Sequence, residues 1–433
     1  MRLLRGAAVG SLVAIVLAAL LGLKAVDDFP YQFGIDFYQF WGVPVAHRQV
    51  EATPYDDPAG YARLLNAQAD ASGNAKLKNA NYFRRSLETM ATPFFYAMFS
   101  WVPGDYEQAQ AFYTALLYVA AAFAVFLLAR ARGVDFWFSV WLGLLVDLTF
   151  NPFVQDVKYG NVSSFQLLYM AAMLTAALRG WPARNAAIAS LYVGSLALFV
   201  AFKPTTLWIA LAFAAHYGLT QGPRRLAAGI GAGIVLALAA FALGAWFFHD
   251  VHAWTQWYRF TQGMNGGSLV RSLEQGNLSL AMMLAQRSMA YGLLTYSLMI
   301  AAWLAFAFLL AMTAMGQRSA LLAPTARSCF ADPWLGLSIG AVYTLATSPL
   351  VWAYYDMFAL VPMFALLRRE STSLQKACVV ASYVAMANPL FAAMAATGLA
   401  PAIPLVMLWS WIPLLVAVLV EAARRRAALE APA

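Results

Sequence analysis

Hydrophobic residues in this chain form long uninterrupted runs and do not alternate with polar ones. Runs of roughly 20 apolar residues are long enough to cross a bilayer as a helix, and they recur from one end of the sequence to the other. We predict spans near residues 7–25, 107–129, 136–150, 162–179, 186–201, 204–219, 226–248, 289–312, 334–349, 350–367, 376–396 and 400–420. The pattern predicts an all-α polytopic membrane protein of about 11–12 transmembrane helices, with residues 1–433 as a single integral membrane domain.

Composition supports this class. Of the 433 residues, 62% are hydrophobic and only 11% are charged, which is too little charge to cover a soluble protein.

The net charge of +8 reflects topology and does not indicate nucleic-acid binding. Basic residues gather at both termini and in alternate connections between spans: Arg2, Arg5, Arg130, Arg132, Arg179, Arg184, Arg224, Arg225, Arg318, Arg327, Arg368, Arg369, Lys376, Arg424, Arg425 and Arg426. Short loops rich in Lys and Arg remain in the cytoplasm. We therefore expect a multi-pass protein of the plasma (inner) membrane with both termini cytoplasmic.

Two further features fit this topology. Residues 1–25 predict a retained signal-anchor helix, because no small-x-small cleavage pattern precedes Asp27; a cleaved secretory signal is the alternative. Cys329 and Cys378 both fall on the predicted cytoplasmic side, where disulfide frameworks are rare.

The non-cytoplasmic side receives two long segments, residues 26–106 and 249–288, which are rich in aromatic residues. Aromatic side chains with a polar tip favour the membrane interface, so we expect short helices lying along the outer leaflet. An aromatic belt that only anchors the protein is the alternative interpretation.

Ionisable residues cluster toward the same side. They are Asp36, Asp147, Asp156, Lys158, Lys203 and Asp356. Ionisable groups in or near membrane segments are costly and usually functional, although each one alone could cap a helix, pair with a neighbour or extend to lipid phosphate.

Such a set suits the transfer of a sugar carried on a lipid phosphate. The phosphate is already a good leaving group, so the reaction needs one carboxylate to take the acceptor proton and cations to hold the phosphate. The sequence lacks GxxxxGK[ST], HExxH, CxxC, GxSxG and DxD stretches. His249, Asp250 and His252 form a weak alternative metal site; we predict no metal and no cofactor.

Several short motifs occur in order along most of the chain. They are DFYQFW (36–41), TPYDD (53–57), ATPFFYAMFSWVP (91–103), YGNVSSFQLLYM (159–170), FKPTTLW (202–208), QGNLSL (275–280) and SPLVWAYYDMFALVP (348–362). Together they resemble glycosyltransferase family 87, whose members have the GT-C fold. The chain departs from the family pattern where YGNVSS replaces a Gly-Gln-x-Asn form and where QGNLSL lacks a Gln between Asn and Ser.

The resemblance implies an inverting glycosyltransferase that moves mannose or arabinose from a polyprenyl phosphate to a glycolipid or glycan acceptor, on the external or periplasmic side. By position Asp36 matches the family's catalytic acidic residue, whose carboxylate is proposed to act as the general base. Asp27 and Asp28 are the alternatives. We assign the donor phosphate to Lys203 and Lys158, with Arg271 as a further candidate. The candidates for substrate binding are Tyr38, Trp41, Asn161, Asn277, Trp352 and Tyr355.

Two other classes of function remain open. A lipid or sugar transporter or flippase would use the ionisable residues as a substrate or coupling site, but no internal repeat of the kind common in transporters is visible. A non-catalytic subunit of a cell-envelope assembly complex would not need Asp36.

Overall fold

The computed structural model describes residues 34–87, 90–102, 104–265, 278, 323–348, 351–399 and 402–430. Within these residues the chain is helical, and its only strand-like pairing is an isolated bridge between Phe150 and Ala387. The predicted all-α class is confirmed. The predicted spans 7–25 and 289–312 lie outside the described residues, as do Asp27, Asp28, Arg271 and Asn277.

The first half of the described chain contains α2 (Ile35–His47), α3 (Pro58–Ala71), α4 (Ala75–Phe83), α5 (Pro93–Phe99), α6 (Tyr106–Ala131), α7 (Phe136–Thr149), α8 (Asn151–Tyr159), α9 (Ser163–Leu178), α10 (Trp181–Arg184), α11 (Ala186–Phe202) and the 3-10 helix η1 (Pro204–Thr206). The second half contains α12 (Leu207–Gln221), α13 (Pro223–Phe247), α14 (Ala253–Asn265), α17 (Ala323–Ala331), α18 (Pro333–Thr347), the 3-10 helix η3 (Ala353–Ala359), α19 (Leu360–Leu366), α20 (Ser373–Ala385), α21 (Asn388–Ala396), α22 (Ile403–Trp409) and α23 (Ile412–Glu430).

Apolar helices dominate the described chain. Three stretches are long and apolar enough to cross a membrane: Tyr106–Ala131, Pro223–Phe247 and Leu405–Leu429. Shorter apolar helices cover Phe136–Thr149, Ser163–Leu178, Ala186–Phe202 and Ala353–Leu366. These helices make the chain an integral membrane protein.

Some stretches expected to be single helices are interrupted. Residues 376–396 divide into α20 and α21 just before Pro389, and residues 400–420 divide into α22 and α23 just before Pro413. Proline lacks the N–H that would continue a helix, but it is well suited to the first turn of a new one. The hydrophobic runs therefore predicted where apolar segments lie, but not where each helix breaks.

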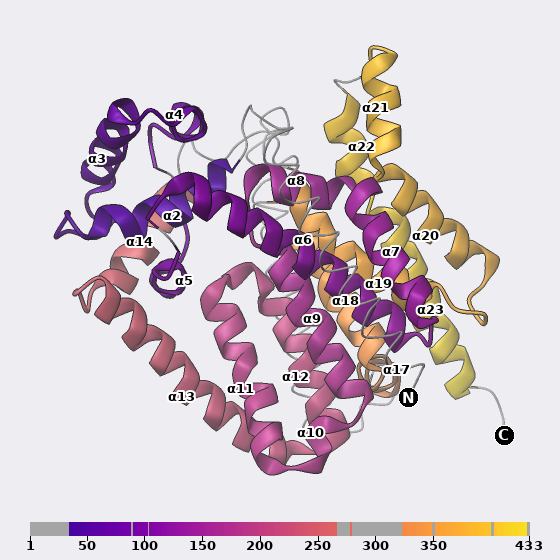
Figure 1. Ribbon diagram of the computed structural model, residues 1–433. Coiled ribbons are helices and arrows are strands. Elements are labelled where there is room, and N and C mark those ends of the chain that lie inside the picture. Colours follow the sequence, from indigo (N-terminus) through magenta and orange to yellow (C-terminus); the bar gives the residue numbers. More distant parts are fainter. Residues whose placement is uncertain are drawn as a thin grey trace, which may run out of the picture.

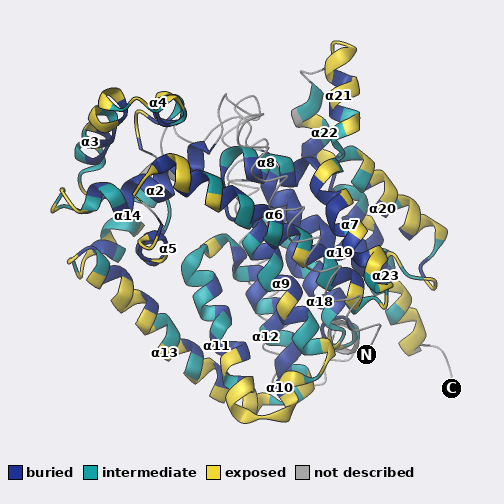
Figure 2. Cartoon of the chain, in the orientation of Figure 1, coloured by how far each residue is buried: buried dark blue, intermediate teal, exposed yellow. Residues whose placement is uncertain are grey.

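The helices are arranged with distinct ends (Figure 1). Helices α2 to α5 and α14 gather at one end, whereas α10, α17 and the C-terminal part of α23 lie at the opposite end. Helices α6 and α9 pack closely in the interior, while the outer side of α13 is exposed (Figure 2). Its exposed apolar side chains are Ile230, Ile234, Leu238 and Phe241, which fits contact with lipid.

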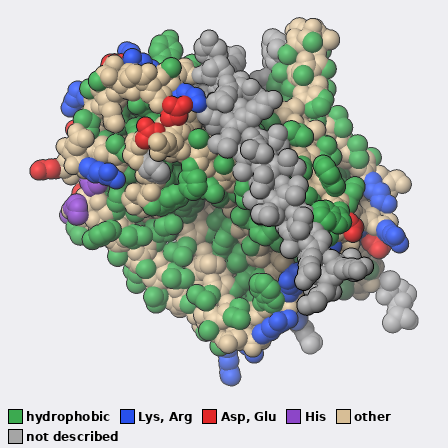
Figure 3. All heavy atoms as spheres, in the orientation of Figure 1, with side chains coloured by type: hydrophobic (Ala, Val, Ile, Leu, Met, Phe, Trp, Pro, Cys, Tyr) green, Lys and Arg blue, Asp and Glu red, His purple; other side chains and the backbone are tan. Residues whose placement is uncertain are grey.

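The α11–α13 pair is held together by close backbone approach. A Cβ atom placed on Gly229 of α13 would lie 2.6 Å from the Val193 Cβ of α11, so only glycine allows this distance between the helices. Small residues at such positions are the usual device for packing helices in membranes. Hydrophobic side chains cover much of the face drawn in Figure 3, and charged side chains lie mainly toward its edges.

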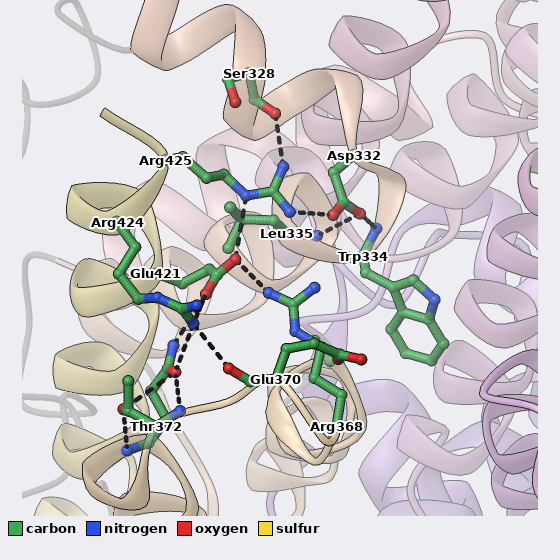
Figure 4. Close-up of polar contacts among 12 residues, drawn as sticks. Ser328, Asp332, Trp334, Leu335, Arg368, Glu370, Thr372, Glu421, Arg424 and Arg425 are labelled. Atoms are coloured by element: carbon green, nitrogen blue, oxygen red, sulfur yellow. Dashed lines mark hydrogen bonds and ion pairs between the residues drawn. The ribbon is translucent and has the colours of Figure 1, made fainter. Parts of the chain in front are cut away.

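At the end of the molecule opposite α2, ion pairs and hydrogen bonds connect α23 to α18 and to the segment between α19 and α20 (Figure 4). Glu421 of α23 is almost completely buried and pairs with Arg368, with Arg424 at 3.3 Å and with Arg425 at 3.3 Å. Arg425 also pairs with Asp332, the N-cap of α18. Arginines from separate basic connections of the sequence therefore meet at one end of the molecule.

Candidate active site

Asp36 lies in the first turn of α2, and Gly34 fixes where that helix begins. Gly34 adopts a left-handed conformation (φ 70°), and its N–H donates to the Lys158 carbonyl at 2.7 Å. A Cβ atom at this position would lie 2.5 Å from Nε2 at the end of the flexible Gln110 side chain, so it is the left-handed backbone that favours glycine here. The helix N-terminus favours the negative charge of Asp36.

Three side chains from distant parts of the sequence hold the Asp36 carboxylate, which is 8% exposed. Arg84 donates from Nη2 to Oδ1 at 2.8 Å. Asn161 donates from Nδ2 to Oδ2 at 2.8 Å, and the Tyr354 hydroxyl donates to the same oxygen at 3.2 Å. The carboxylate is thus oriented by the C-cap of α4, the turn between α8 and α9, and η3.

Asn161 joins Asp36 to Lys203. The Lys203 ammonium donates to Asn161 Oδ1 at 2.9 Å, and the Val162 N–H donates to the same oxygen at 2.8 Å. Because Oδ1 accepts from both donors, the Nδ2 group of Asn161 must face the carboxylate. The amide orientation therefore follows from the hydrogen-bond pattern.

Lys203 is the C-cap of α11. Its ammonium lies 4.4 Å from the ring centroid of Tyr355 and 5.6 Å from that of Tyr354, close enough for cation–π attraction. Burial lowers the pKa of Lys203 below the usual 10.5, while the negative charges of Asp156 and Asp36 act in the opposite direction. The side chain is a partly buried cation that holds its proton less firmly than an exposed lysine.

Asp156 has a different role from Asp36. Its carboxylate accepts hydrogen bonds from Ser163 N–H at 3.0 Å, Ser164 N–H at 2.8 Å and Ser164 Oγ at 2.6 Å. These contacts satisfy the first turn of α9, where backbone donors lack helical partners. Asp156 therefore fixes the α8–α9 turn that carries Asn161.

Asp36, Arg84, Asn161 and Lys203 line one cavity of about 510 Å³. The same cavity is also lined by aromatic side chains, those of Phe40, Phe83, Phe95, Phe202 and Trp257. Cavities of this size hold small organic ligands, and a few convergent polar groups orient them. The arrangement suits a ligand with one charged and one apolar part.

The structure brings five of the candidate residues to this cavity: Asp36, Asn161, Lys203, Trp352 and Tyr355. Tyr38 and Trp41 lie elsewhere, in the packing around α2. The Tyr38 hydroxyl donates to Asn81 Oδ1 at 2.8 Å, and the Trp41 ring packs edge-on against Tyr106 at 5.0 Å.

Lys158 is also absent from the cavity lining; its ammonium lies 5.6 Å from the Tyr159 ring centroid.

Arg84 lines the cavity but is not among the candidates from the sequence analysis. It lies 48 positions from Asp36 in the sequence. The sequence showed only that it is a basic residue in the aromatic-rich segment predicted to be external.

The described residues contain no group of three or more His, Cys, Asp or Glu side chains that could hold a metal ion. In the weak candidate at 249–252, the Asp250 carboxylate instead accepts hydrogen bonds from the His252 N–H at 2.7 Å and from Gln256 at 2.9 Å.

Comparison with known proteins gave one finding. A family model described as glycosyltransferase family 87 matches residues 91–333, more than half of the chain. Comparisons with curated proteins and with solved structures found no match. The matched range contains Asn161 and Lys203, whereas Asp36 and Arg84 precede it.

Proposed function

Because the chain belongs to glycosyltransferase family 87, we propose that it transfers a sugar of the mannose or arabinose type from a polyprenyl-phosphate donor to a glycolipid or glycan acceptor. The observation that carries this proposal is the cavity in which a buried carboxylate and a partly buried ammonium are joined through one amide, Asp36–Asn161–Lys203. The aromatic wall of the same cavity provides an apolar surface for the lipid side of the donor.

Asp36 acts as the general base in this proposal. It takes the proton of the acceptor hydroxyl, whose oxygen attacks the anomeric carbon on the face opposite the phosphate. The bond between that carbon and the phosphate oxygen breaks, its electron pair leaves with the phosphate, and the configuration inverts. Asn161 and Tyr354 orient the carboxylate through Oδ2.

Lys203 holds the donor phosphate. As the bond breaks, the phosphate gains a second negative charge, and a buried cation stabilises that charge more strongly than an exposed one. Trp352 and Tyr355, which line the cavity beside Lys203, provide flat faces for the sugar.

We place the reaction on the non-cytoplasmic side. Arg368, Arg424 and Arg425, which come from predicted cytoplasmic connections, meet at the end opposite α2 (Figures 1 and 4). The positive-inside rule assigns that end to the cytoplasm and the Asp36 end to the outer leaflet.

The test offers the purified protein radiolabelled mannosyl and arabinosyl polyprenyl phosphates together with a lipid extract from its own cells. We compare the wild type with Asp36→Asn and with the matched control Asp70→Asn, which changes an exposed acid of α3. We expect transfer by wild type and control and at least a 100-fold loss in Asp36→Asn, a typical effect of removing a general base.

Equal transfer by Asp36→Asn would move the base to another acid, with Asp27 and Asp28 as the next candidates. If neither donor supports transfer by any variant, the donor class is wrong, and a transporter or a non-catalytic subunit becomes the better interpretation.

A further inference from the structure

Arg84 lies in the wall of the cavity that holds Lys203. Its side chain is 8% exposed, and its guanidinium contacts the opposite carboxylate oxygen of Asp36 from the one held by Asn161. Two cationic side chains therefore flank the Asp36 carboxylate. Arg84 contacts one oxygen directly, and Lys203 is linked to the other oxygen through Asn161.

The formal charges of the residues that line the cavity indicate which kind of ligand Arg84 and Lys203 bind. Among the described residues that line it, Asp36, Arg84 and Lys203 carry formal charge, which gives a net charge of +1. A sugar linked to a polyprenyl phosphate is a phosphodiester with one negative charge, so it balances the formal charge of these three residues. A buried site of this kind favours balanced charge.

Sugar transfer keeps this balance while moving the charges. The acceptor proton passes to Asp36, which becomes neutral, and the leaving phosphate becomes a dianion. Arg84 and Lys203 then face two negative charges on the phosphate. Asp36, which pairs with Arg84 before the transfer, has lost its charge. The planar guanidinium can bind two oxygens of a phosphate at once.

We propose that Arg84 is the second phosphate-binding cation, paired with Asp36 in the free protein and transferred to the leaving phosphate as Asp36 takes up the proton. This inference rests on the proposed function, because it requires a phosphate leaving group in the same cavity.

Asn161 keeps Asp36 in place while the cations move. Its Oδ1 accepts from the Val162 N–H as well as from Lys203. When Lys203 turns to the phosphate, the backbone donor still fixes the amide, so Nδ2 continues to face the carboxylate. The base keeps its orientation during the exchange of partners.

The test measures binding and needs no turnover. A polyprenyl monophosphate, and the methyl phosphodiester of the same prenyl chain, are titrated into purified wild-type protein, Arg84→Gln, Arg84→Lys, Asp36→Asn and Arg85→Gln. Arg85 is the matched control, since it is an exposed arginine next in sequence that does not line the cavity. Thermal unfolding of each variant checks that it is folded.

We expect Arg84→Gln to weaken binding of the monophosphate at least tenfold and binding of the phosphodiester less, because only the monophosphate becomes a dianion. Arg84→Lys should recover part of the loss, and Arg85→Gln should bind as the wild type does. Asp36→Asn should bind the monophosphate several-fold more tightly, because the variant removes a negative charge from the lining of the cavity.

Unchanged binding of the monophosphate by a folded Arg84→Gln protein would show that Arg84 only positions Asp36, and would overturn the inference while leaving sugar transfer through Asp36 intact. If Arg84-dependent binding occurs but no sugar is transferred, the transfer reaction fails and the phosphate site stands. Absence of binding by the wild type would overturn both.

Discussion

At the residue scale, the candidate site depends on the side-chain amide of Asn161, which hydrogen-bonds to two charged groups. Asn161 receives a hydrogen bond from Lys203 and gives one to Asp36, so the cation and the carboxylate are held apart and aligned. Direct pairing between them would neutralise both groups, whereas separation by the amide leaves the ammonium available for a phosphate.

The lowered pKa of Lys203 predicts a pH dependence. Lysine attracts phosphate only in its protonated form, so kcat/KM for the donor should fall as the pH rises through the pKa of Lys203, below the usual lysine value of 10.5. Lys203→Arg should abolish this fall, because a guanidinium stays charged throughout the range. The measurement is kcat/KM for the donor between roughly pH 6.5 and 10.

The control for this profile is Lys158→Arg, which changes a lysine outside the cavity lining and should keep the wild-type fall. An alkaline limb in Lys203→Arg identical to that of the wild type would mean that another group controls donor capture.

Sequence reasoning placed Asp36, Asn161 and Lys203 at the site because each lies in a motif at the predicted external side. It also grouped Tyr38 and Trp41 with Asp36, whereas neither residue lines the cavity. On a helix, residues three and four apart share a face, and the cavity is indeed lined by Asp36, Gln39 and Phe40. Arg84 could not be predicted, because nothing in the sequence indicates that α4 ends beside α2.

At the element scale, glycine determines how closely the membrane helices approach. The contact of Gly229 with Val193 sets the separation of α13 from α11. These helices make the most extensive contact in the described chain, and α11 ends at Lys203. The packing of α13 therefore bears on the position of Lys203, the residue that we propose binds the donor phosphate.

Gly229→Leu should destabilise the protein by about 1–3 kcal/mol, because the new side chain overlaps Val193 and forces the helices apart. Gly231→Leu is the matched control on the same helix, since a Cβ atom there meets nothing within 4 Å. Thermal unfolding in detergent measures both. Equal transition temperatures for the two variants would contradict the packing argument.

The sequence predicted the positions of the apolar helices because each coincides with a hydrophobic run, although several of these helices are shorter than a bilayer span. It did not predict the breaks between α20 and α21 or between α22 and α23. Proline in an apolar run permits either a kinked helix or two separate helices, and tertiary contacts decide between them. One such contact is the bridge from Phe150 to Ala387 at the α20–α21 break.

At the scale of the whole molecule, the charged groups are divided between two ends. The network around Glu421 lies at one end, and the Asp36 cavity is lined by α2 residues at the other. The distribution of arginine in the sequence predicted this division, although the partners of the arginines became apparent only from the structure.

The topology predicts which cysteines a membrane-impermeant thiol reagent can reach. In a background of Cys329→Ser and Cys378→Ser, Gly73→Cys in the turn between α3 and α4 should react in sealed, right-side-out vesicles. Glu370→Cys, an exposed position beside the arginine network, should react only after permeabilisation. Labelling in the reverse order would place the Asp36 cavity on the cytoplasmic side.

The position of Asp36, Arg84 and Lys203 at one end has an energetic consequence for the proposed reaction. In that reaction Asp36 takes a proton from the acceptor and returns it to water on the same side of the bilayer, and the cations proposed to hold the phosphate lie on that side too. The proposed catalytic cycle therefore moves no charge across the membrane, and the membrane potential does no work on it. The driving force of the proposed reaction is the difference in free energy between the sugar–phosphate bond that breaks and the glycosidic bond that forms.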